Sequence, residues 1–358
     1  MRILCVDPGV NFSTMDVYTG MVYGLRYNGH TAIPYYYTRR IDVMAYALQK
    51  AYKESVRETP DLPKPNAADA ALWTTELAVT WALRHQPDFV IIVSGMYWHP
   101  DGFILLKRAG IKTGIVLTET PYSIHNEMRY AELADIVWTN ERTSVDVIKT
   151  INPNTHYLPH AWNPQVHGVD TGIINIEDVP QHDVVFVGTG WWERCQWLSE
   201  VDWSGINLGL YGSWGLLPKK HKLRHFIKGG VVPNQSTAAL YRRAKIGLNF
   251  FRRSVGFTRD AAQILTAESL NPRSYELAAT GCFHVSDYRE EVTEVFGELV
   301  PTFKTSAELE QVIRKWLADD HGRQQVASRL PDAVKNHTWK ERVAQMVASI
   351  QDTLESRA

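Results

Sequence analysis

Paired cysteines, long apolar runs and an excess of charge of either sign are all missing from this 358-residue sequence. Its three cysteines, Cys5, Cys195 and Cys282, are far apart and form no C-x-x-C pair. This spacing excludes a disulfide framework or a zinc ribbon and predicts free thiols in a reducing compartment. A formal net charge of −1 argues against a partner held mainly by bulk charge, such as duplex DNA on a basic surface.

Targeting signals and common nucleotide or metal motifs are also missing. No stretch reaches the roughly 20 apolar residues of a membrane span, and the opening MRILCVDPG lacks the regions of a secretory signal peptide. The sequence contains no D-x-D, no G-x-G-x-x-G, no Walker A motif, no G-x-S-x-G and no H-E-x-x-H. We therefore expect a cytoplasmic protein without integral membrane association, and we expect no bound metal and no cofactor.

What the sequence does contain is a regular alternation of short apolar segments with longer helical patterns, which predicts an α/β fold with parallel sheets. The apolar segments lie at residues 2–7, 88–95, 111–120, 132–141, 182–190, 206–215 and 282–287, with a helix running into a strand at 239–251. The chain is long enough for two domains. We predict an N-terminal domain over 1–162, a C-terminal domain over 163–335 and a C-terminal helix over 336–358. The stretch 331–353 is one long amphipathic helix or a broken pair.

One segment, TAESLNPRSYELAATGCFHVSD (266–287), carries the clearest local signals. Asn271 is a good N-cap, Pro272 suits the first helical position, and Gly281 suits the residue after the C-cap, so a short helix is punctuated at both ends. Arg273 in the first turn opposes the helix dipole but is well placed to bind phosphate. Glu276 lies one turn further along. The alternative interpretation is a solvated helix face with incidental charges.

The order of motifs resembles that of two-domain GT-B glycosyltransferases, most closely the group similar to the spore maturation protein CgeB. The resemblance rests on TETPY, DIVWTN, YLPHAWNP, DVVFVGTG, LYRRAKIGLNF, NPRSYELAATGCFHVSD and HTWKERV, which occur in this order over nearly the whole chain. It implies two Rossmann-like domains with parallel sheets facing a central cleft, the terminal helix packing back on the N-terminal domain. The nucleotide sugar would lie mainly on the C-terminal domain and the acceptor mainly on the N-terminal one.

The resemblance also implies roles for the donor-side residues. Glu268 and Glu276 match the E-x7-E spacing of retaining GT-B enzymes, in which the first glutamate approaches the sugar and the second the ribose. The glycine turn after DVVFV offers backbone amides to a phosphate, with Arg194 as a counter-charge. The predicted donor-binding residues are Gly188, Thr189, Arg194, Tyr211, Asn249, Asn271, Arg273 and Glu276.

On the N-terminal domain, polar residues follow the ends of predicted strands, where α/β folds bind their ligands. The loop after the first strand carries Gly9, Asn11 and Asp16, and His125 follows the third strand; we expect Gly9, Asp16 and His125 on the acceptor side. A transferase needs a group that accepts the acceptor's proton or supports the leaving diphosphate. Glu119 and His99 are the preferred pair, with Glu268 as the third predicted catalytic residue.

We interpret the chain as a metal-independent hexosyl- or pentosyltransferase that moves a sugar from a nucleoside-diphosphate sugar, preferably a UDP-sugar, to an acceptor hydroxyl. The acceptor is a small molecule, a glycan, a protein or modified DNA, and the protein is a monomer or homodimer. Two alternatives stay open. One is a transferase acting on hydroxylated bases in DNA through the basic segment 217–230. The other is a non-catalytic nucleotide-sugar-binding protein of the same fold.

Overall fold

The structure, a computed structural model, describes residues 1–9, 13–168 and 174–356. The chain divides into two compact units. Unit 1 consists of Met1–Pro159 with Trp339–Ala358, and unit 2 consists of His160–Thr338. The predicted boundaries, after residues 162 and 335, each lie three residues from the observed ones.

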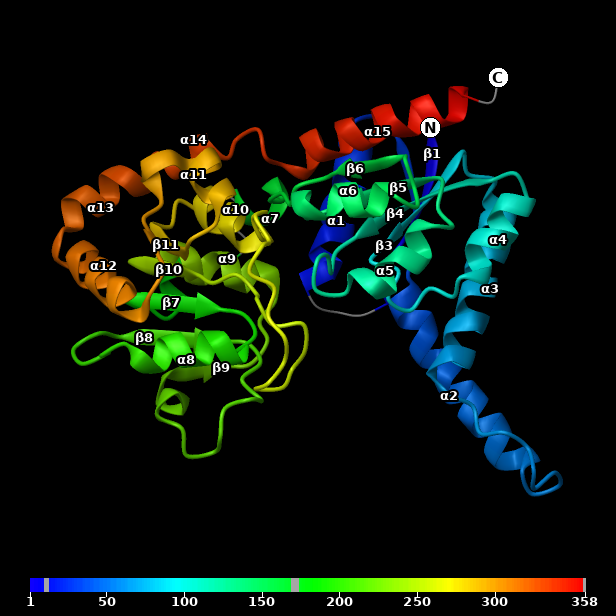
Figure 1. Cartoon of the computed structure of the whole chain (residues 1–358), viewed down its shortest axis with the longest axis horizontal. Helices are drawn as coiled ribbons and strands as arrows, with labels where there is room; N and C mark the ends of the chain where they lie inside the picture. The colour runs from blue at the N-terminus through cyan, green and yellow to red at the C-terminus, as the bar shows by residue number, and fades with distance from the viewer. Residues whose placement is uncertain (10–12, 169–173, 357–358) are drawn as a thin grey trace. The chain divides into compact units, whose positions relative to one another are not determined.

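Unit 1 is a six-stranded parallel sheet in the order β2-β1-β3-β4-β5-β6 (Figure 1). The strands are β1 (Arg2–Val6), β2 (Thr31–Tyr35), β3 (Phe89–Val93), β4 (Lys112–Leu117), β5 (Ile136–Thr139) and β6 (Thr155–Tyr157). The helices are α1 (Ser13–Tyr27), α2 (Tyr37–Ser55), α3 (Ala67–His85), α4 (Asp101–Arg108), α5 (Ile124–Ala131), α6 (Val145–Lys149) and α15 (Trp339–Glu355), with a 3-10 turn at Arg142–Ser144. The central strand β3 is buried along its whole length, as a strand covered on both faces must be.

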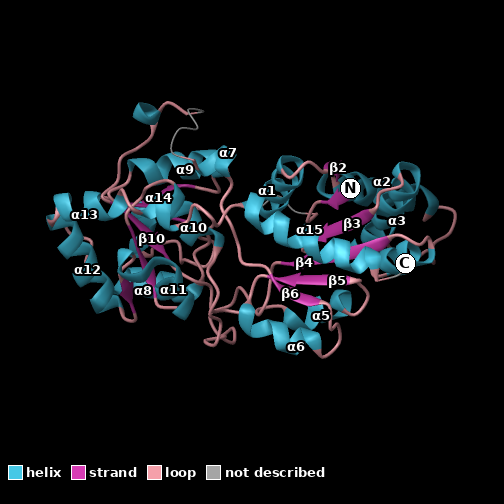
Figure 2. Cartoon of the chain, turned by 90° about the horizontal axis from the view of Figure 1, so that it is seen from above, coloured by secondary structure: helices cyan, strands magenta, loops and turns pink. Residues whose placement is uncertain are grey.

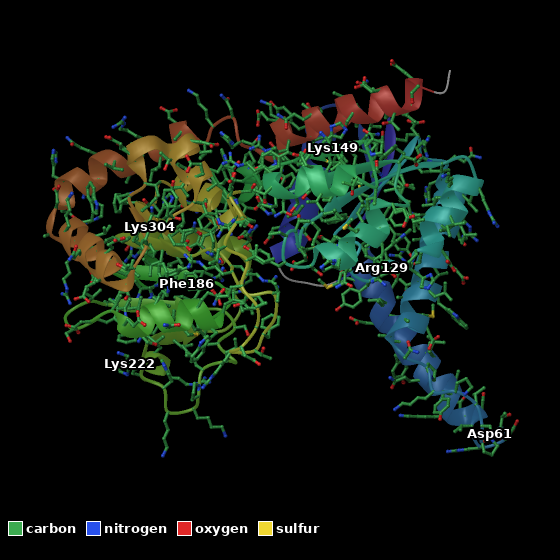
Figure 3. The ribbon with its side chains drawn as sticks, in the orientation of Figure 1. Asp61, Arg129, Lys149, Phe186, Lys222 and Lys304 are labelled. Atoms are coloured by element: carbon green, nitrogen blue, oxygen red, sulfur yellow. The ribbon has the colours of Figure 1, made fainter. Side chains whose placement is uncertain are left out.

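The C-terminal helix belongs to unit 1, where α15 packs along α1. Small residues allow the close approach, because a Cβ atom at Gly20 would lie 2.0 Å from Cδ1 of Trp339. At Gly24 it would lie 2.4 Å from the Trp339 carbonyl oxygen. Elsewhere in the unit, α2 and α3 form a pair whose connection carries Asp61 (Figure 3).

Unit 2 repeats the architecture, with a parallel sheet in the order β12-β11-β10-β7-β8-β9 (Figure 1). Figure 2 shows the strands and helices of each unit from above. The strands are β7 (Val184–Val187), β8 (Leu208–Tyr211), β9 (Ile227–Gly229), β10 (Ile246–Asn249), β11 (His284–Asp287) and β12 (Thr302–Phe303). The α-helices are α7 (Pro164–His167), α8 (Trp192–Glu200), α9 (Asn234–Arg243), α10 (Pro272–Ala279), α11 (Glu290–Phe296), α12 (Ser306–Ala318), α13 (Asp320–Ala327) and α14 (Leu330–Ala333). Short 3-10 helices lie at Ile176–Asp178, Lys222–Phe226 and Gly297–Leu299.

The predicted α/β class with two parallel sheets is confirmed. The stretch 331–353 is a broken pair, α14 and α15, rather than one helix. The three cysteines are buried free thiols, and burial raises the pKa of the Cys5 and Cys282 thiols to about 12. Among the described residues, no helix has the length and apolar character needed to cross a membrane.

Candidate functional site

The neighbouring strands β11, β10 and β7 of unit 2 end at Asp287, Asn249 and Val187. Because the three strands are parallel, the loops that follow them leave from one edge of the sheet. Helix α10 begins beside these loops, as its contacts with Val187 and Phe250 show. Ligands of open α/β sheets bind at the carboxyl ends of the strands, so this edge is the candidate site.

Asn271 anchors the start of α10 to the sheet. Its Oδ1 accepts from the backbone N–H of Ser274 at 3.0 Å, and Pro272 occupies the first helical turn, so the predicted cap is confirmed. Gly281 follows the C-cap with φ +69°, also as predicted. The Nδ2 of Asn271 donates to Oδ1 of Asn249 at 2.9 Å. The helix N-terminus is therefore held directly on the end of β10.

Asn249 is the hub of this network and is fully buried. Its Nδ2 donates to Oγ of Ser274 and Oγ of Ser286, each at 2.9 Å, while its Oδ1 accepts from Asn271. We predicted a contact between Asn249 and the donor. The structure instead uses both polar atoms of the Asn249 amide to join β10, β11 and α10, which is a structural task.

Arg273 lies across the carboxyl ends of β7 and β10. Its Nε donates to the Val187 carbonyl at 2.8 Å and its Nη1 to the Phe250 carbonyl at 3.4 Å. Its guanidinium carbon lies 4.8 Å from the centre of the Phe186 ring, which Figure 3 labels within the sheet. These contacts show that Arg273 has a structural role, which its sequence context did not indicate. A guanidinium has five N–H donors, more than the two carbonyl bonds and the hydrogen bond to the Tyr241 side chain use, so Arg273 can also bind an anion.

The glycine turn after β7 is shaped around that arginine. A Cβ atom at Gly188 would lie 2.3 Å from Nη2 of Arg273. The amide of Gly188 donates to the Tyr211 carbonyl at 3.0 Å, and that of Gly190 to the Ser213 carbonyl at 2.7 Å. The prediction that these two amides approach a phosphate is therefore corrected, because both are already paired. Gly188 is needed because a larger residue there would collide with the Arg273 side chain.

Arg194 and Tyr211 also turn out to support the loops. Arg194 is buried, and its Nη1 and Nη2 donate to the carbonyls of Thr189 at 2.9 Å and Phe250 at 2.8 Å. It ties the loop after β7 to the loop after β10, whereas we expected it to supply a counter-charge to a phosphate. The hydroxyl of Tyr211 lies 2.9 Å from Nε2 of His182, so this side chain is bound within the sheet.

Glu276 is buried in α10, and burial raises the pKa of its carboxyl to about 7, against the opposing effects of Arg273 and the Asn234 side chain. Its Oε1 lies 3.8 Å from Nε2 of His167, a buried residue of α7. Sequence reasoning missed both His167 and Asn234, because the connections to α7 and α9 are long-range. Glu268 is half-buried on the coil before α10, so the two glutamates of E-x7-E leave from different local structures.

A cluster of arginines beyond those predicted also lies at this edge. Asp287 is buried, which raises its pKa to about 6, while a bond from the Phe251 amide and the charges of Arg253, Arg289 and Arg194 oppose the shift. Nη2 of Arg253 lies 3.4 Å from Oδ2 of Asp287. The signal was present in the sequence, since NFFRR and SDYRE place arginines directly after two strands.

The predicted residues of unit 1 lie in the loops after its strands. Glu119 follows β4 and is half-buried, and its backbone N–H donates to Oε1 of the buried Glu127 at 2.9 Å. His99 lies between β3 and α4, with Nδ1 3.6 Å from Oδ2 of Asp101. Because β3 and β4 are adjacent and parallel, Glu119 and His99 share one edge of the sheet.

The three predicted acceptor-side residues differ in exposure. Gly9 is buried with φ +79°, Asp16 is half-buried in the first turn of α1, and His125 is exposed in α5. Asn11 lies outside the described residues. No group of three or more His, Cys, Asp or Glu side chains able to hold a metal ion occurs in the described ranges.

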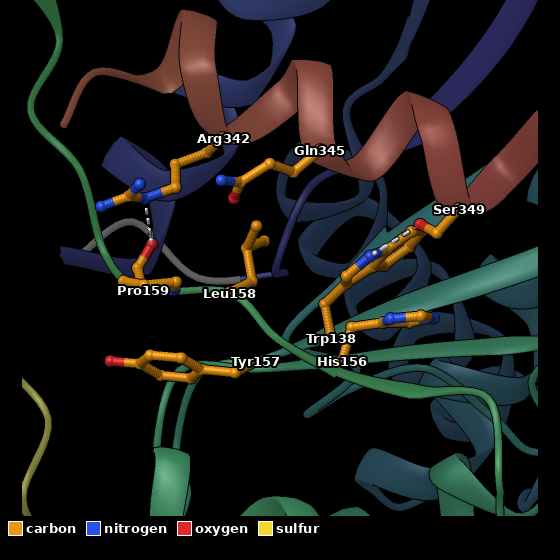
Figure 4. A pocket seen from close by; sticks show the side chains of 8 residues that line it. All are labelled: Trp138, His156, Tyr157, Leu158, Pro159, Arg342, Gln345 and Ser349. Atoms are coloured by element: carbon orange, nitrogen blue, oxygen red, sulfur yellow. Dashed lines mark hydrogen bonds between the residues drawn. The ribbon is translucent and has the colours of Figure 1, made fainter. Parts of the chain in front are cut away.

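Unit 1 also has a cavity of about 310 Å³ beside α15 (Figure 4). Within it, Nε1 of Trp138 donates to Oγ of Ser349 at 3.3 Å, and Nε of Arg342 donates to the Pro159 carbonyl at 3.1 Å. Its lining is Trp138, His156, Tyr157, Leu158, Pro159, Arg342, Gln345 and Ser349, which includes none of the predicted site residues.

Residues 176–348 match the family model described as "Glycosyl transferase-like". The spore protein CgeB of Bacillus subtilis (strain 168) is 26% identical over 208 residues, which are 56% of this chain and 64% of that protein. The matched region thus spans less than two thirds of the relative. The predicted resemblance to glycosyltransferases of the CgeB-like group is confirmed.

Solved structures establish the fold. A sucrose-phosphate synthase from Thermosynechococcus elongatus superposes with a TM-score of 0.62 at 10% identity, covering 99% of this chain and all of that one (100%). An α,α-trehalose 6-phosphate synthase from Burkholderia multivorans gives a TM-score of 0.59 at 11% identity, covering 100% of this chain and 99% of that one. The chain has the GT-B fold, as predicted.

Proposed function

We propose that this chain, whose residues 176–348 match a glycosyltransferase-like family model and which has a GT-B fold, transfers a sugar from a nucleoside-diphosphate sugar to an acceptor hydroxyl. The observation that carries the proposal is the arrangement of α10 on the sheet of unit 2. Arg273 is held across the ends of β7 and β10, and Glu276 lies one turn further along the same helix.

This arrangement supports a diphosphate beside Arg273 and a ribose beside Glu276. The start of α10 presents the positive end of the helix dipole, and an arginine binds phosphate oxygens through paired N–H donors. Together they can neutralise a leaving diphosphate, so we propose that the reaction needs no divalent metal. We further propose UDP as the nucleotide. A carboxylate one turn beyond the diphosphate can accept both ribose hydroxyls.

The proposed catalytic residues are Glu119, His99 and Glu268. A carboxylate or imidazole at a strand end of unit 1 can take the proton of the acceptor hydroxyl, and Glu268 would approach the sugar. Conservative replacement decides among them: Glu119→Gln, His99→Gln and Glu268→Gln each keep the size of the side chain and remove its proton-accepting group. The variant that loses kcat while keeping donor affinity identifies the residue that acts in the chemical step.

The proposal is tested by incubating the wild type and Glu276→Ala with a panel of nucleotide sugars and an acceptor pool, and measuring nucleoside-diphosphate release. We expect release by the wild type, undiminished by a chelator of divalent ions, and a strong loss in Glu276→Ala. If the chelator abolishes the wild-type reaction, the proposed metal independence is wrong, but the proposed transferase activity stands. Tight binding of a nucleotide without release on any acceptor would replace the transferase by a non-catalytic binding protein.

A further inference from the structure

The contacts of His167 determine which nitrogen of its neutral ring carries the hydrogen. The backbone N–H of Asn163 donates to its Nδ1 at 3.2 Å, so Nδ1 is the acceptor and Nε2 carries the hydrogen. Burial lowers the pKa of His167 to about 4, with the neighbouring Arg242 acting in the same direction and Asn234 and Asn163 opposing it. The ring is therefore neutral near pH 7 and presents one N–H donor.

The Nε2 atom of His167 lies close to the carboxylate of Glu276. Only 2% of the His167 side chain and 11% of the Glu276 side chain are exposed, and Nε2 lies 3.8 Å from Oε1. Within the described part of the chain, Nε2 makes no hydrogen bond of normal geometry, although the Asn234 side chain is near enough to raise the pKa of His167 and to lower that of Glu276. Normal N–H···O bonds are about 2.9 Å long, so a movement of about 1 Å would join the two groups.

Four other residues of the described chain face Glu276 in these contacts. Arg273 lies on the same helix, Tyr241 and Asn234 belong to α9, and His167 belongs to α7. Burial disfavours the ionised carboxylate, while Arg273 and Asn234 favour it. A charge-assisted bond from a neutral imidazole would also favour the ionised carboxylate. It would do so without adding a positive charge that could attract the diphosphate away from Arg273.

We propose that His167 is a positioning residue: its Nε2–H donates to Oε1 of Glu276 in the donor complex, which directs Oε2 of the carboxylate to the ribose hydroxyls. This inference rests on the proposed function, because it assumes a nucleotide ribose at Glu276. His167 acts through Glu276, since its own side chain is almost completely covered. Loss of His167 should therefore weaken recognition of the ribose and leave the other parts of the nucleotide unaffected.

The test compares His167→Leu with His167→Gln. Leucine fills similar space without a donor, whereas the glutamine amide can place an N–H near the Nε2 position. The probes are the nucleoside diphosphate that the wild type binds best and its 2′,3′-dideoxy counterpart, titrated by calorimetry between pH 6 and 8.5. We expect His167→Leu to lose about tenfold in affinity for the ribonucleotide, the loss that one charge-assisted bond accounts for, and to change dideoxynucleotide affinity less than about twofold. His167→Gln should stay close to the wild type on both probes.

The pH profile gives a second readout. Ribonucleotide affinity in His167→Leu should rise with pH through a higher midpoint than in the wild type, because the ionised carboxylate has lost a donor. Equal losses on both probes, or no loss on the ribonucleotide, would overturn the positioning role and leave the proposed function standing. If the wild type binds no nucleoside diphosphate, both the positioning role of His167 and the proposed function are wrong. If His167→Leu does not fold, His167→Asn, whose shorter amide reaches only the Nδ1 position, supplies the same contrast with His167→Gln.

Discussion

Gly188 and Arg273 fit together so closely that a Cβ atom on the glycine would lie 2.3 Å from Nη2 of the arginine. The two residues come from the turn after β7 and the first turn of α10, and Arg273 also bonds the Val187 carbonyl at the end of β7. The turn and the first turn of the helix therefore both pack against the guanidinium that we propose to bind the diphosphate.

Gly188→Ala should therefore displace Arg273 and weaken nucleotide binding. We expect at least a tenfold loss of nucleoside-diphosphate affinity, equivalent to about 1.4 kcal/mol, because the guanidinium must leave its bond to the Val187 carbonyl. Calorimetric titration measures the loss. Gly215→Ala is the matched control, since no atom lies within 4 Å of the Cβ position there. Equal affinities of the two variants would contradict the fit between Gly188 and Arg273.

Asn249→Ala should reduce stability. The substitution leaves Ser274, Ser286 and Asn271 without their partner in a fully buried network, and we expect the free energy of unfolding to fall by about 2–4 kcal/mol. Urea denaturation gives this quantity. Asn126→Ala, at an exposed position, should change it by less than about 0.5 kcal/mol. A similar small change for Asn249→Ala would show that the hub does not hold α10 on the sheet.

Glu276→Gln should become more stable relative to the wild type as the pH rises. Burial raises the pKa of Glu276 from 4.5 to about 7, so between these values the native state holds a proton that the unfolded chain has released. The wild type accordingly loses stability as the pH increases through this window, and the glutamine variant does not. The difference in unfolding free energy should grow by up to about 3 kcal/mol between pH 4.5 and pH 8, as measured by urea denaturation. A difference independent of pH would mean that folding does not change the pKa of Glu276.

The exposed lysines of the basic segment should not affect donor binding. Lys219, Lys220 and Lys222 lie at and before a 3-10 helix on the surface of unit 2, and Figure 3 labels Lys222 there. The triple replacement by glutamine should keep nucleotide affinity within about twofold, because these side chains are exposed and salt screens their charges. DNA binding that falls steeply with salt in the wild type, and is lost in the triple variant, would instead make modified DNA the acceptor.

Local patterns predicted the local structure well. Asn271, Pro272 and Gly281 mark the ends of α10 in sequence as they do in the structure, because capping depends on residues within one turn. The alternation of apolar segments likewise predicted two parallel sheets, since burial on both faces leaves a signature in each strand.

Long-range contacts could not be predicted in this way. The bond from Arg273 to Val187 joins residues 86 positions apart, and it adds a structural role to the ligand-binding role expected for that arginine. The buried His167 beside Glu276 was missed for the same reason, because neither residue's neighbours in sequence indicate the pairing. The amides of Gly188 and Gly190 looked available for a phosphate, yet the strand β8 and its following loop provide their partners.

The most direct test of the account is a thermal-shift panel of nucleoside diphosphates and nucleotide sugars, applied to the wild type and to Arg273→Ala. A ligand that binds only the native state raises the melting temperature by mass action. We expect a clear rise in the wild type with the nucleotides of one base, UDP and UDP-sugars, and little or no rise in Arg273→Ala. A wild type whose melting temperature no nucleotide or nucleotide sugar changes would contradict the claim that unit 2 binds a nucleoside-diphosphate sugar.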